Sequence, residues 1–439
     1  MCYDLLDTKE FDNRLIELRR DFHKYPEPGW LEYRTTVKII EILTNLGVPV
    51  LWGKDIHTSS AMMGLPSKEK QVAAMDRAIK ETGRADMISQ MSGGFTGVVG
   101  VIEGTLPGPT IAIRVDIDAN DLTEADDPSH RPVREGFTSI HPESMHACGH
   151  DAHIAIGLGV AEILSKNKNK LRGKVKIIFQ AAEEGGRGAC SLVESGLFEG
   201  VDYFFGGHIG LNEAPYGTVA ASTYGFLSGV KFDVTFSGKA AHAGKAPEEG
   251  RNAIAAAATA VLNLLAISRS GKGVSRVNVG TLHGGTGRNV IPDKAFMRAE
   301  VRGINKEVSD YMFDNALRVC KAAADMYQCQ FSYEIVGKSE NAVCDMDFAK
   351  FVQNTALSFD DVSNAPEASD LGAGENVTFM MNDVRKRGGK ATFMLLGADI
   401  NAPHHSKMFD FNEKVVPLGA RLYAKLVFDL GKAYTGNSI

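Results

Sequence analysis

Two residues with metal-binding side chains lie two positions apart in the segment 145–151, which reads MHACGHD. Cys148 supplies a thiolate and His150 an imidazole nitrogen, immediately ahead of a sequence typical of a helix. From a loop or a strand end, this spacing can aim both side chains at one point. Such a mixed sulfur and nitrogen pair suits zinc, manganese or cobalt. A Cys-x-His sequence is common, so the pair indicates a metal site without establishing one.

The adjacent carboxylates Glu183 and Glu184 directly follow the apolar run Val175–Phe179 and precede two glycines. Two like charges at the buried end of a strand are costly unless a cation or a proton compensates them. Successive side chains of an extended backbone point to opposite sides, so the two carboxylates should divide the work. One can bind metal while the other handles a proton, and Glu183 is our candidate for the base.

Two histidines complete the candidate set. His208 follows the apolar run Tyr203–Gly207, and His405 lies in the C-terminal region. A hydrogen-bonded structural histidine is the alternative for each of them. The predicted ligands are Cys148, His150, Glu184, His208 and His405. This set suits metal-assisted hydrolysis, in which a carboxylate that is not a ligand takes a proton from water and passes it to the leaving amine.

The elements that would position these residues alternate between strands and helices. The predicted strands are 97–102, 110–115, 174–179 and 203–207, and the predicted helices are 151–165 and 187–194. This alternation predicts an α/β sheet with crossover connections. Asp116, Asp118 and the glutamates all follow the C-terminal ends of these strands. Open α/β sheets bind ligands at that edge.

The pattern changes near residue 225. Residues 230–236 alternate apolar and polar side chains, which is typical of a half-solvated antiparallel strand. The elements that follow have the order β-α-β-β-α-β, which predicts a small ferredoxin-like domain. A chain of 439 residues is also too long for one ordinary core. We therefore expect a mixed-sheet α/β catalytic domain formed by residues 1–224 and 336–439, with an α+β domain inserted at 225–335.

Composition and charge argue against several classes of partner. The formal net charge of −6, with no basic block, argues against nucleic acid or an anionic membrane surface. No apolar run is long enough to span a bilayer, and the acidic N-terminal segment lacks the features of a signal peptide. Six scattered cysteines do not form a disulfide framework in a chain of this size. We therefore expect a reduced, cytoplasmic setting.

Four motifs occur in order along the chain: HACGHD at 146–151, AAEEG at 181–185, GHIG at 207–210, and His405 followed by FDF at 409–411. Together they resemble the aminoacylase/carboxypeptidase-type metallohydrolases, specifically the hippurate-hydrolase-like branch in which a cysteine is a metal ligand. The resemblance covers nearly the whole chain. It implies a di-metal exopeptidase-like catalytic domain, and it makes the inserted domain a lid and dimerisation domain.

The same resemblance implies roles for the candidate residues. It implies that the five ligands hold two divalent metal ions, for which we expect manganese, with zinc or cobalt as alternatives. Glu183 aligns with the general acid and base, and Asp116 with a residue that supports a ligand. His404 rivals its neighbour as the last ligand, but only the neighbour keeps the family spacing to the FDF motif. His146 and His153 are expected to be structural or supporting residues.

The inserted domain should contribute to substrate recognition. His242 aligns with a family histidine that reaches a neighbouring subunit's site and steadies the tetrahedral oxyanion, and Asn289 aligns with a residue near the substrate's carboxylate. Arg288 and Arg302 are candidate carboxylate clamps, because arginine forms bidentate pairs with planar anions. A surface salt bridge is the alternative for each arginine. One departure from the family pattern is Asn376, which stands where close relatives carry an aspartate.

The activity that the resemblance implies is hydrolysis of p-aminobenzoyl-glutamate, a folate breakdown product, to p-aminobenzoate and glutamate. The enzyme would be a homodimer or a heterodimer with a related subunit. The motifs alone support only amide hydrolysis of an N-acylated amino acid, so another aminoacylase or hippurate-like activity is an alternative. A non-catalytic partner subunit is a third possibility, although all five ligands and Glu183 are present.

Overall fold

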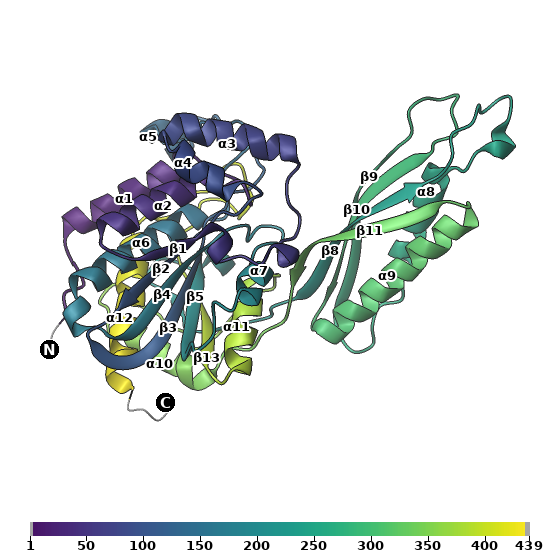
Figure 1. Cartoon of the computed structure of the whole chain (residues 1–439). Coiled ribbons are helices and arrows are strands. Elements are labelled where there is room, and N and C mark those ends of the chain that lie inside the picture. The colour runs from purple at the N-terminus through teal and green to yellow at the C-terminus, as the bar shows by residue number, and fades with distance from the viewer. Residues whose placement is uncertain (1–2, 435–439) are drawn as a thin grey trace. The chain divides into compact units, whose positions relative to one another are not determined.

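The computed structural model describes residues 3–434, which form two compact units, each with its own apolar core (Figure 1). The first unit comprises the described residues up to 224, residues 342–371, and those from 377 onward. The second unit comprises residues 225–341 and 372–376. Its last strand extends to Ser339, so this unit runs a few residues beyond the predicted boundary at 335. Among the described residues, no helix combines the length and apolar character needed to cross a membrane.

A seven-stranded mixed sheet forms the centre of the first unit. Its strands are β1 (Val50–Trp52), β2 (Val98–Glu103), β3 (Leu106–Asp116), β4 (Arg172–Gln180), β5 (Tyr203–Ile209), β6 (Val219–Ala220) and β13 (Lys390–Leu396). They lie in the order β1-β2-β4-β3-β5-β13-β6. The central strands β4, β3, β5 and β13 are parallel, and the outer pairs are antiparallel. The prediction of an α/β fold with a mixed sheet is confirmed. The two-residue strand β12 (Ser369–Asp370) pairs with β7 (Thr223–Tyr224).

Helices cover both sides of this sheet. The helices of the first unit are α1 (Lys9–Lys24), α2 (Tyr33–Asn45), α3 (Lys68–Thr82), α4 (Ala85–Ile88), α5 (Arg131–Glu135), α6 (His150–Lys166), α7 (Ala189–Glu194), α10 (Met346–Ala356), α11 (Val377–Lys386) and α12 (Val415–Ala433). α6 and α12 pack against each other over β3 and β4, and α1 packs against both helices. α7 and α11 pack together on the other side, beside β5 and β13 (Figure 1).

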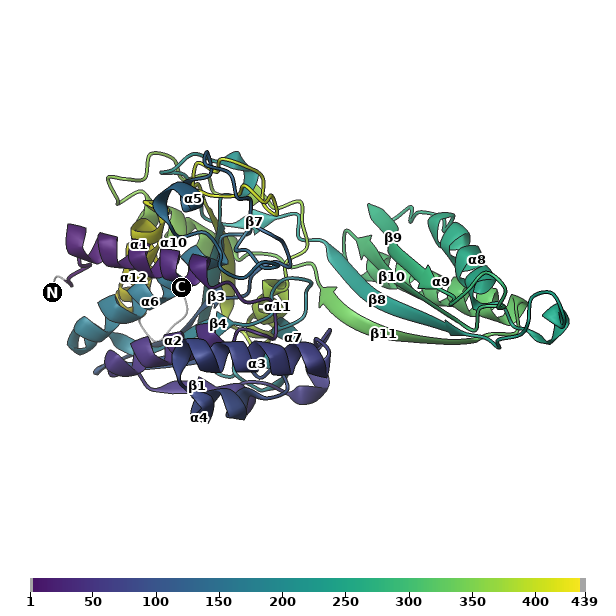
Figure 2. The same cartoon turned by 90° about the horizontal axis from the view of Figure 1, so that it is seen from above.

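The second unit is a four-stranded antiparallel sheet with two helices on one face (Figure 2). Its elements are, in order, β8 (Ser228–Ser237), α8 (Ala253–Leu265), β9 (Ser275–Gly284), β10 (Lys294–Gly303), α9 (Lys306–Met326) and β11 (Gln330–Ser339). The strands lie in the order β11-β8-β10-β9. Fully buried and half-buried residues alternate along β8, because one face of this strand meets the helices. This order of elements is the β-α-β-β-α-β arrangement.

Candidate metal centre

Three strands of the first unit deliver candidate residues to one edge of the sheet. Asp116 is the last residue of β3, the pair Glu183 and Glu184 follows β4, and His208 lies near the end of β5. Because these strands are parallel neighbours, their C-terminal ends lie side by side. His150 begins α6, so the loop before that helix brings Cys148 to the same edge.

The five predicted ligands come together in overlapping groups. Ligand atoms of Cys148, Glu184 and His405 lie within 4.8 Å of one another, and His150 forms a second such group with both glutamates. Cys148 Sγ lies 3.4 Å from His208 Nε2, and Glu184 Oε1 lies 3.2 Å from His405 Nε2. Metal bonds of roughly 2.0–2.3 Å in a tetrahedral arrangement separate neighbouring ligand atoms by roughly 3.3–3.8 Å. These spacings therefore fit a divalent ion.

In His150 and His208, the ring nitrogen Nδ1 donates a hydrogen bond to a main-chain carbonyl, which leaves Nε2 free to bind a metal. His150 Nδ1 donates to the carbonyl of Asp118 at 2.8 Å, and its Nε2 is buried without a hydrogen-bond partner. His208 Nδ1 donates to the carbonyl of Ile209 at 2.8 Å, which directs Nε2 toward Cys148. A second hydrogen bond of this kind fixes the tautomer of a metal-binding histidine. The donor set is therefore consistent with a metal site.

Asp118 orients both glutamates. Its two carboxylate oxygens accept the main-chain N–H groups of Glu183 and Glu184, each at 2.9 Å. Asn120, two residues further on, hydrogen-bonds the Glu184 carboxylate and accepts the N–H of Ala147 at 3.1 Å. Sequence reasoning missed the roles of Asp118 and Asn120. The acidic residues Asp116 and Asp118 at alternate positions indicated the end of a strand. They gave no indication that Asp118 would accept hydrogen bonds from main-chain groups.

Asp116 is fully buried between a cation and a histidine. Arg114 Nη1 lies 2.8 Å from one carboxylate oxygen, and His153 Nδ1 donates to the other oxygen. His153 Nε2 accepts the N–H of Ile209 at 3.1 Å, so both of its ring nitrogens are engaged. His153 therefore has no lone pair left for a metal. Asp116 lies 3.6 Å from His150 Nε2, where it can stabilise positive charge on that ring.

The charges at this edge are strongly perturbed. Burial opposes ionisation of Glu184, but the hydrogen bond from His405 and the positive charge of His150 lower its pKa to about 2. Burial likewise opposes protonation of His150, yet the Asp116 carboxylate holds its pKa well above the usual value. Burial and the nearby Glu184 raise the pKa of the Cys148 thiol. The acidic groups thus draw a compensating positive charge to this edge.

His405 and its neighbour His404 contribute differently. His404 Nε2 donates to the carbonyl of Ile209 at 3.1 Å, and His404 also forms a candidate metal-binding group with Cys148 and His208. His405 has a left-handed backbone with φ 64°, and its N–H donates to Ala147 at 2.8 Å. Such a conformation is unfavourable for a residue with a side chain and clusters at functional sites. The turn holds His405 against Glu184.

The predicted substrate residues lie in the second unit. A β-bridge and its hydrogen bonds join the segments of His242 and Asn289 into one loop pair, and both side chains are exposed. Arg288, next to Asn289, is also exposed. Arg302 instead donates from Nε and Nη2 to the two carboxylate oxygens of Glu300, at 3.0 and 3.1 Å. This contact is the salt bridge that the sequence left open as its alternative role.

A buried ionic cluster lies beneath the first turn of α6. Arg19, on α1, is fully buried. Its Nε lies 2.8 Å from Asp151, its Nη2 3.1 Å from Asp410, and its Nη1 3.1 Å from Glu413. Asp151 directly follows the predicted ligand His150. The other two acids follow the predicted ligand His405, in the segment that precedes α12. The Arg19 cluster therefore links two of the segments that carry ligands.

His23 belongs to the same cluster. His23 Nδ1 lies 2.9 Å from Asp151, and His23 Nε2 lies 2.9 Å from Glu124. Burial and the charge of Arg19 oppose protonation of His23, but hydrogen bonds with Asp151 and Glu124 outweigh them and raise its pKa to about 9. His23 is therefore a buried cation at neutral pH.

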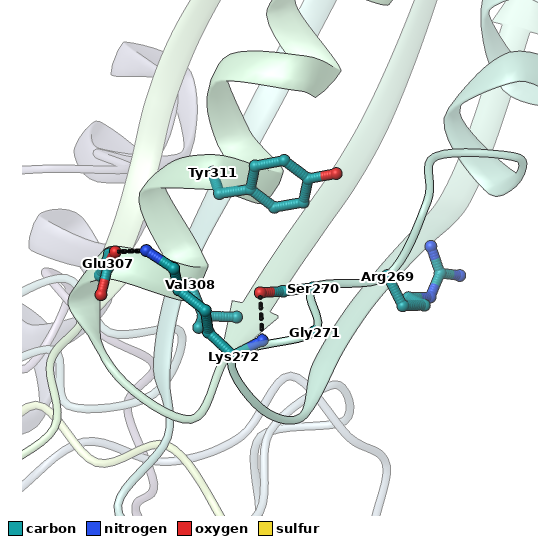
Figure 3. Close-up of a pocket in the computed structure, with 7 residues that line it drawn as sticks. All are labelled: Arg269, Ser270, Gly271, Lys272, Glu307, Val308 and Tyr311. Carbon is teal, nitrogen blue, oxygen red and sulfur yellow. Dashed lines mark hydrogen bonds and ion pairs between the residues drawn. The ribbon is translucent and has the colours of Figure 1, made fainter.

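A surface pocket of about 340 Å³ lies in the second unit and contains none of the predicted site residues (Figure 3). Its lining residues are Arg269, Ser270, Gly271, Lys272, Glu307, Val308 and Tyr311. Lys272 forms an ion pair with Glu307, and Arg269 donates to the carbonyl of Ile267 at 2.7 Å. Because its cations already have partners, this pocket carries no sign of hydrolytic chemistry.

Similarity to known proteins extends over most of the chain. Residues 112–429 match the model of Peptidase family M20/M25/M40. The chain is 41% identical to an indole-3-acetyl-aspartic acid hydrolase of Enterobacter agglomerans, over 93% of this chain and 94% of that protein. It is also 41% identical to one of the subunits of p-aminobenzoyl-glutamate hydrolase from Escherichia coli (strain K12), over 94% of each protein.

Solved structures show the same fold. The aminobenzoyl-glutamate utilization protein from Klebsiella pneumoniae matches with a TM-score of 0.83 and 36% identity, covering 97% of this chain and 98% of that one. A Bacillus subtilis protein described as a dinuclear metal binding peptidase of the M20 family matches with a TM-score of 0.66 and 26% identity. That match covers 97% of this chain and 99% of the other.

Proposed function

The chain belongs to peptidase family M20/M25/M40, and on that premise we propose that it is a metal-dependent amidohydrolase that cleaves p-aminobenzoyl-glutamate to p-aminobenzoate and glutamate. The observation that carries this proposal is the set of overlapping ligand groups at the sheet edge, with Glu183 beside it. A cluster of this composition supports hydrolysis of a linear amide. No feature of it requires a redox or transfer reaction.

The similar proteins support the substrate class. By their names, one relative acts on an aspartate conjugate of an indole-3-acetyl group and another on a glutamate conjugate of a p-aminobenzoyl group. Both substrates join an aromatic acyl group to an acidic amino acid through one amide. Since the identity is 41% in each case, indole-3-acetyl-aspartate is the second candidate substrate. Another N-acyl amino acid is a more distant alternative.

The residues divide the work as follows. Cys148, His150, Glu184, His208 and His405 would hold two divalent ions, with manganese as first candidate and zinc or cobalt as alternatives. Bound ions of this kind polarise a carbonyl and acidify water. Glu183 takes the proton from the attacking water and passes it to the leaving amine. The main-chain N–H of Glu183 donates to Asp118, and this hydrogen bond fixes the backbone position from which the Glu183 side chain extends.

The second unit supplies the remaining groups. As the resemblance implies, His242 reaches a neighbouring subunit's site and donates to the tetrahedral oxyanion, and Asn289 with Arg288 binds the α-carboxylate of the amino-acid half. Arg302 is the weaker candidate, because its guanidinium is already paired. Asp116 supports the ligand His150 and takes no direct part in proton transfer.

Assembly through the second unit is part of the same proposal. Within the part of the chain that the structure describes, the edge strand β9 has no neighbour on one side, and it exposes Leu282. α8 exposes Ile254, Leu262 and Leu265. A free strand edge beside exposed apolar side chains favours pairing with another chain. We therefore assign this surface to a homodimer or to a heterodimer with a related subunit, working in the cytoplasm.

Substrate profiling tests the function. The purified chain, loaded with manganese and assayed with and without a related partner subunit, should release p-aminobenzoate from p-aminobenzoyl-glutamate, measured by chromatography. Indole-3-acetyl-aspartate and N-acetylated neutral amino acids serve as comparisons. Cleavage of the neutral substrates alone would replace the proposal with an aminoacylase activity. No cleavage under any condition would favour a non-catalytic subunit.

A further inference from the structure

Arg187 is a half-buried cation in the turn after β4, three residues beyond Glu184. Its Nε donates to the main-chain carbonyl of Glu184 at 2.7 Å, and its Nη1 lies 3.5 Å from the carbonyls of Gly29 and Gly64. Among the residues that the structure describes, no carboxylate forms an ion pair with this guanidinium. Carbonyl dipoles hold Arg187 in place, but they leave its positive charge without a counterion.

The surroundings of Arg187 are shaped to hold it. A Cβ atom on Gly29 would lie 2.3 Å from Nη2 and 2.9 Å from Cζ of Arg187, so a larger residue would displace the guanidinium. Gly185 and Gly186 have φ of 85° and 76°, which suits glycine. They form the turn that returns Arg187 to the carbonyl of Glu184, closed by a 2.8 Å hydrogen bond from Gly186 N–H to Glu183. The guanidinium is therefore held in one position.

This position adjoins the edge of the first unit's sheet where Cys148, His150, Glu184, His208 and His405 meet, which we call the metal edge. The turn that carries Arg187 also carries both glutamates, and a β-bridge between Pro28 and Ala119 ties the Gly29 segment to the residue after Asp118. Arg114, at the same edge, already pairs with a carboxylate. Arg187 is thus a half-buried cation next to the two glutamates, and no carboxylate among the described residues neutralises it.

We propose that Arg187 binds the side-chain carboxylate of the amino-acid half of the substrate and so makes the enzyme selective for conjugates of glutamate or aspartate. This inference rests on the proposed function. Every N-acyl amino acid has an α-carboxylate, which is assigned to Asn289 and Arg288. An acidic amino acid brings a second carboxylate, which needs a second cation. The N–H groups of the planar guanidinium that the carbonyls do not use can donate to it, and the partial burial of Arg187 strengthens the contact.

The test compares two substrates that differ only in that charge, p-aminobenzoyl-glutamate and p-aminobenzoyl-glutamine. In Arg187→Met, loaded with metal and supplied with any required partner, the ratio of kcat/KM for the two should fall by about 10-fold to 100-fold, mainly through KM for the glutamate conjugate. The ratio for Arg187→Lys should lie between those of the wild type and Arg187→Met, because lysine keeps the charge but not the planar array of N–H groups.

Arg172 provides a matched control at the opposite end of β4. It is exposed, and its Nη1 donates only to a main-chain carbonyl, that of Pro107 at 3.4 Å. Arg172→Met should leave the substrate ratio unchanged. An unchanged ratio in Arg187→Met, or an equal loss for both substrates, overturns the inference. If Arg187→Met loses metal or fails to fold, Arg187→Lys decides by the same ratio.

Failure of the proposed function would give a different result. If the wild-type protein cleaves neither conjugate, calorimetric binding of p-aminobenzoyl-glutamate to the metal-loaded wild type and to Arg187→Lys still tests the subsite. Weaker binding of the glutamate conjugate alone to the variant supports it, whereas equal binding of both conjugates to both proteins contradicts it.

Discussion

The metal edge of the first unit and the loop pair of the second unit differ in how their side chains are held. At the metal edge, Asp118 and His150 are buried and joined by hydrogen bonds to main-chain groups. In the loop pair, His242 and Asn289 are exposed. Groups that bear the chemistry are thus fixed in advance, while groups assigned to the substrate remain accessible. Substitutions beneath the metal edge should cost stability, and substitutions in the loop pair should cost activity alone.

Glu183→Gln should have the largest effect on activity. The amide keeps the size of the side chain but cannot accept the proton of the water, so kcat should fall by about 10²-fold to 10⁴-fold. Metal content, measured by elemental analysis, should stay near that of the wild type. Loss of metal would instead mean that Glu183 is a ligand and that the two glutamates have exchanged roles.

Arg19→Met should have the largest effect on stability. It leaves three acids of the Arg19 cluster buried beside an apolar side chain, and breaking a buried ion pair costs about 3–5 kcal/mol. The free energy of unfolding, measured in urea for the first unit's transition, should fall by that amount. A variant as stable as the wild type would show that the cluster contributes nothing to holding the metal edge.

His242→Ala tests the other side of the comparison. Removing a donor to an oxyanion lowers kcat by about 10²-fold to 10³-fold. Because the side chain is exposed, the free energy of unfolding should change by less than about 0.5 kcal/mol. Normal kcat in this variant would remove His242 from the site, and a large loss of stability would contradict the contrast between the two regions.

The pH dependence of stability should report His23. Its pKa in the folded protein is about 9, against about 6.5 for the free side chain. The protonated ring therefore contributes stability that is fully present below pH about 6.5 and is lost as the pH rises through 9. The free energy of unfolding should fall by roughly 1–3 kcal/mol across this range. His23→Gln should flatten that fall, and an equal slope in both proteins would exclude His23 as its source.

Arg302→Met should have the smallest effect. Its ion pair with Glu300 lies on the partly exposed surface of β10, where such pairs contribute less than about 1 kcal/mol. Urea unfolding of the second unit's transition measures this difference. A loss as large as that of Arg19→Met would remove the contrast between buried and exposed charges. A large rise in KM would restore Arg302 as a carboxylate clamp.

The sequence predicts the parts of the molecule that depend on local pattern. The apolar runs locate β2, β3, β4 and β5, because each crosses a buried sheet. α12 was not among the predicted elements, although Arg421, Lys425, Asp429 and Lys432 recur along it at helical spacing and leave only a narrow polar face on a largely buried helix. The sequence could also predict the ion pair between Glu300 and Arg302, because residues two positions apart on a strand lie on the same face.

The supports of the metal edge could not be predicted in this way. Ligand types and motif order indicate which residues meet, but Asp118 acts on main-chain N–H groups, which every residue offers. Arg19 contacts acids 391 and 394 positions away in the chain, and no local pattern encodes such a partner. These contacts become visible only when the strands and helices are arranged in space.

The separation of Arg19 from Asp410 and Glu413 also sets an order of assembly. During synthesis, α1 leaves the ribosome long before Asp410 and Glu413 exist, so Arg19 has only Asp151 among the three acids of its cluster until the chain is nearly complete. The sheet of the second unit draws only on residues 228–339 and can form earlier. We expect the interrupted first unit to close last, so metal uptake becomes a late event in the life of the nascent chain.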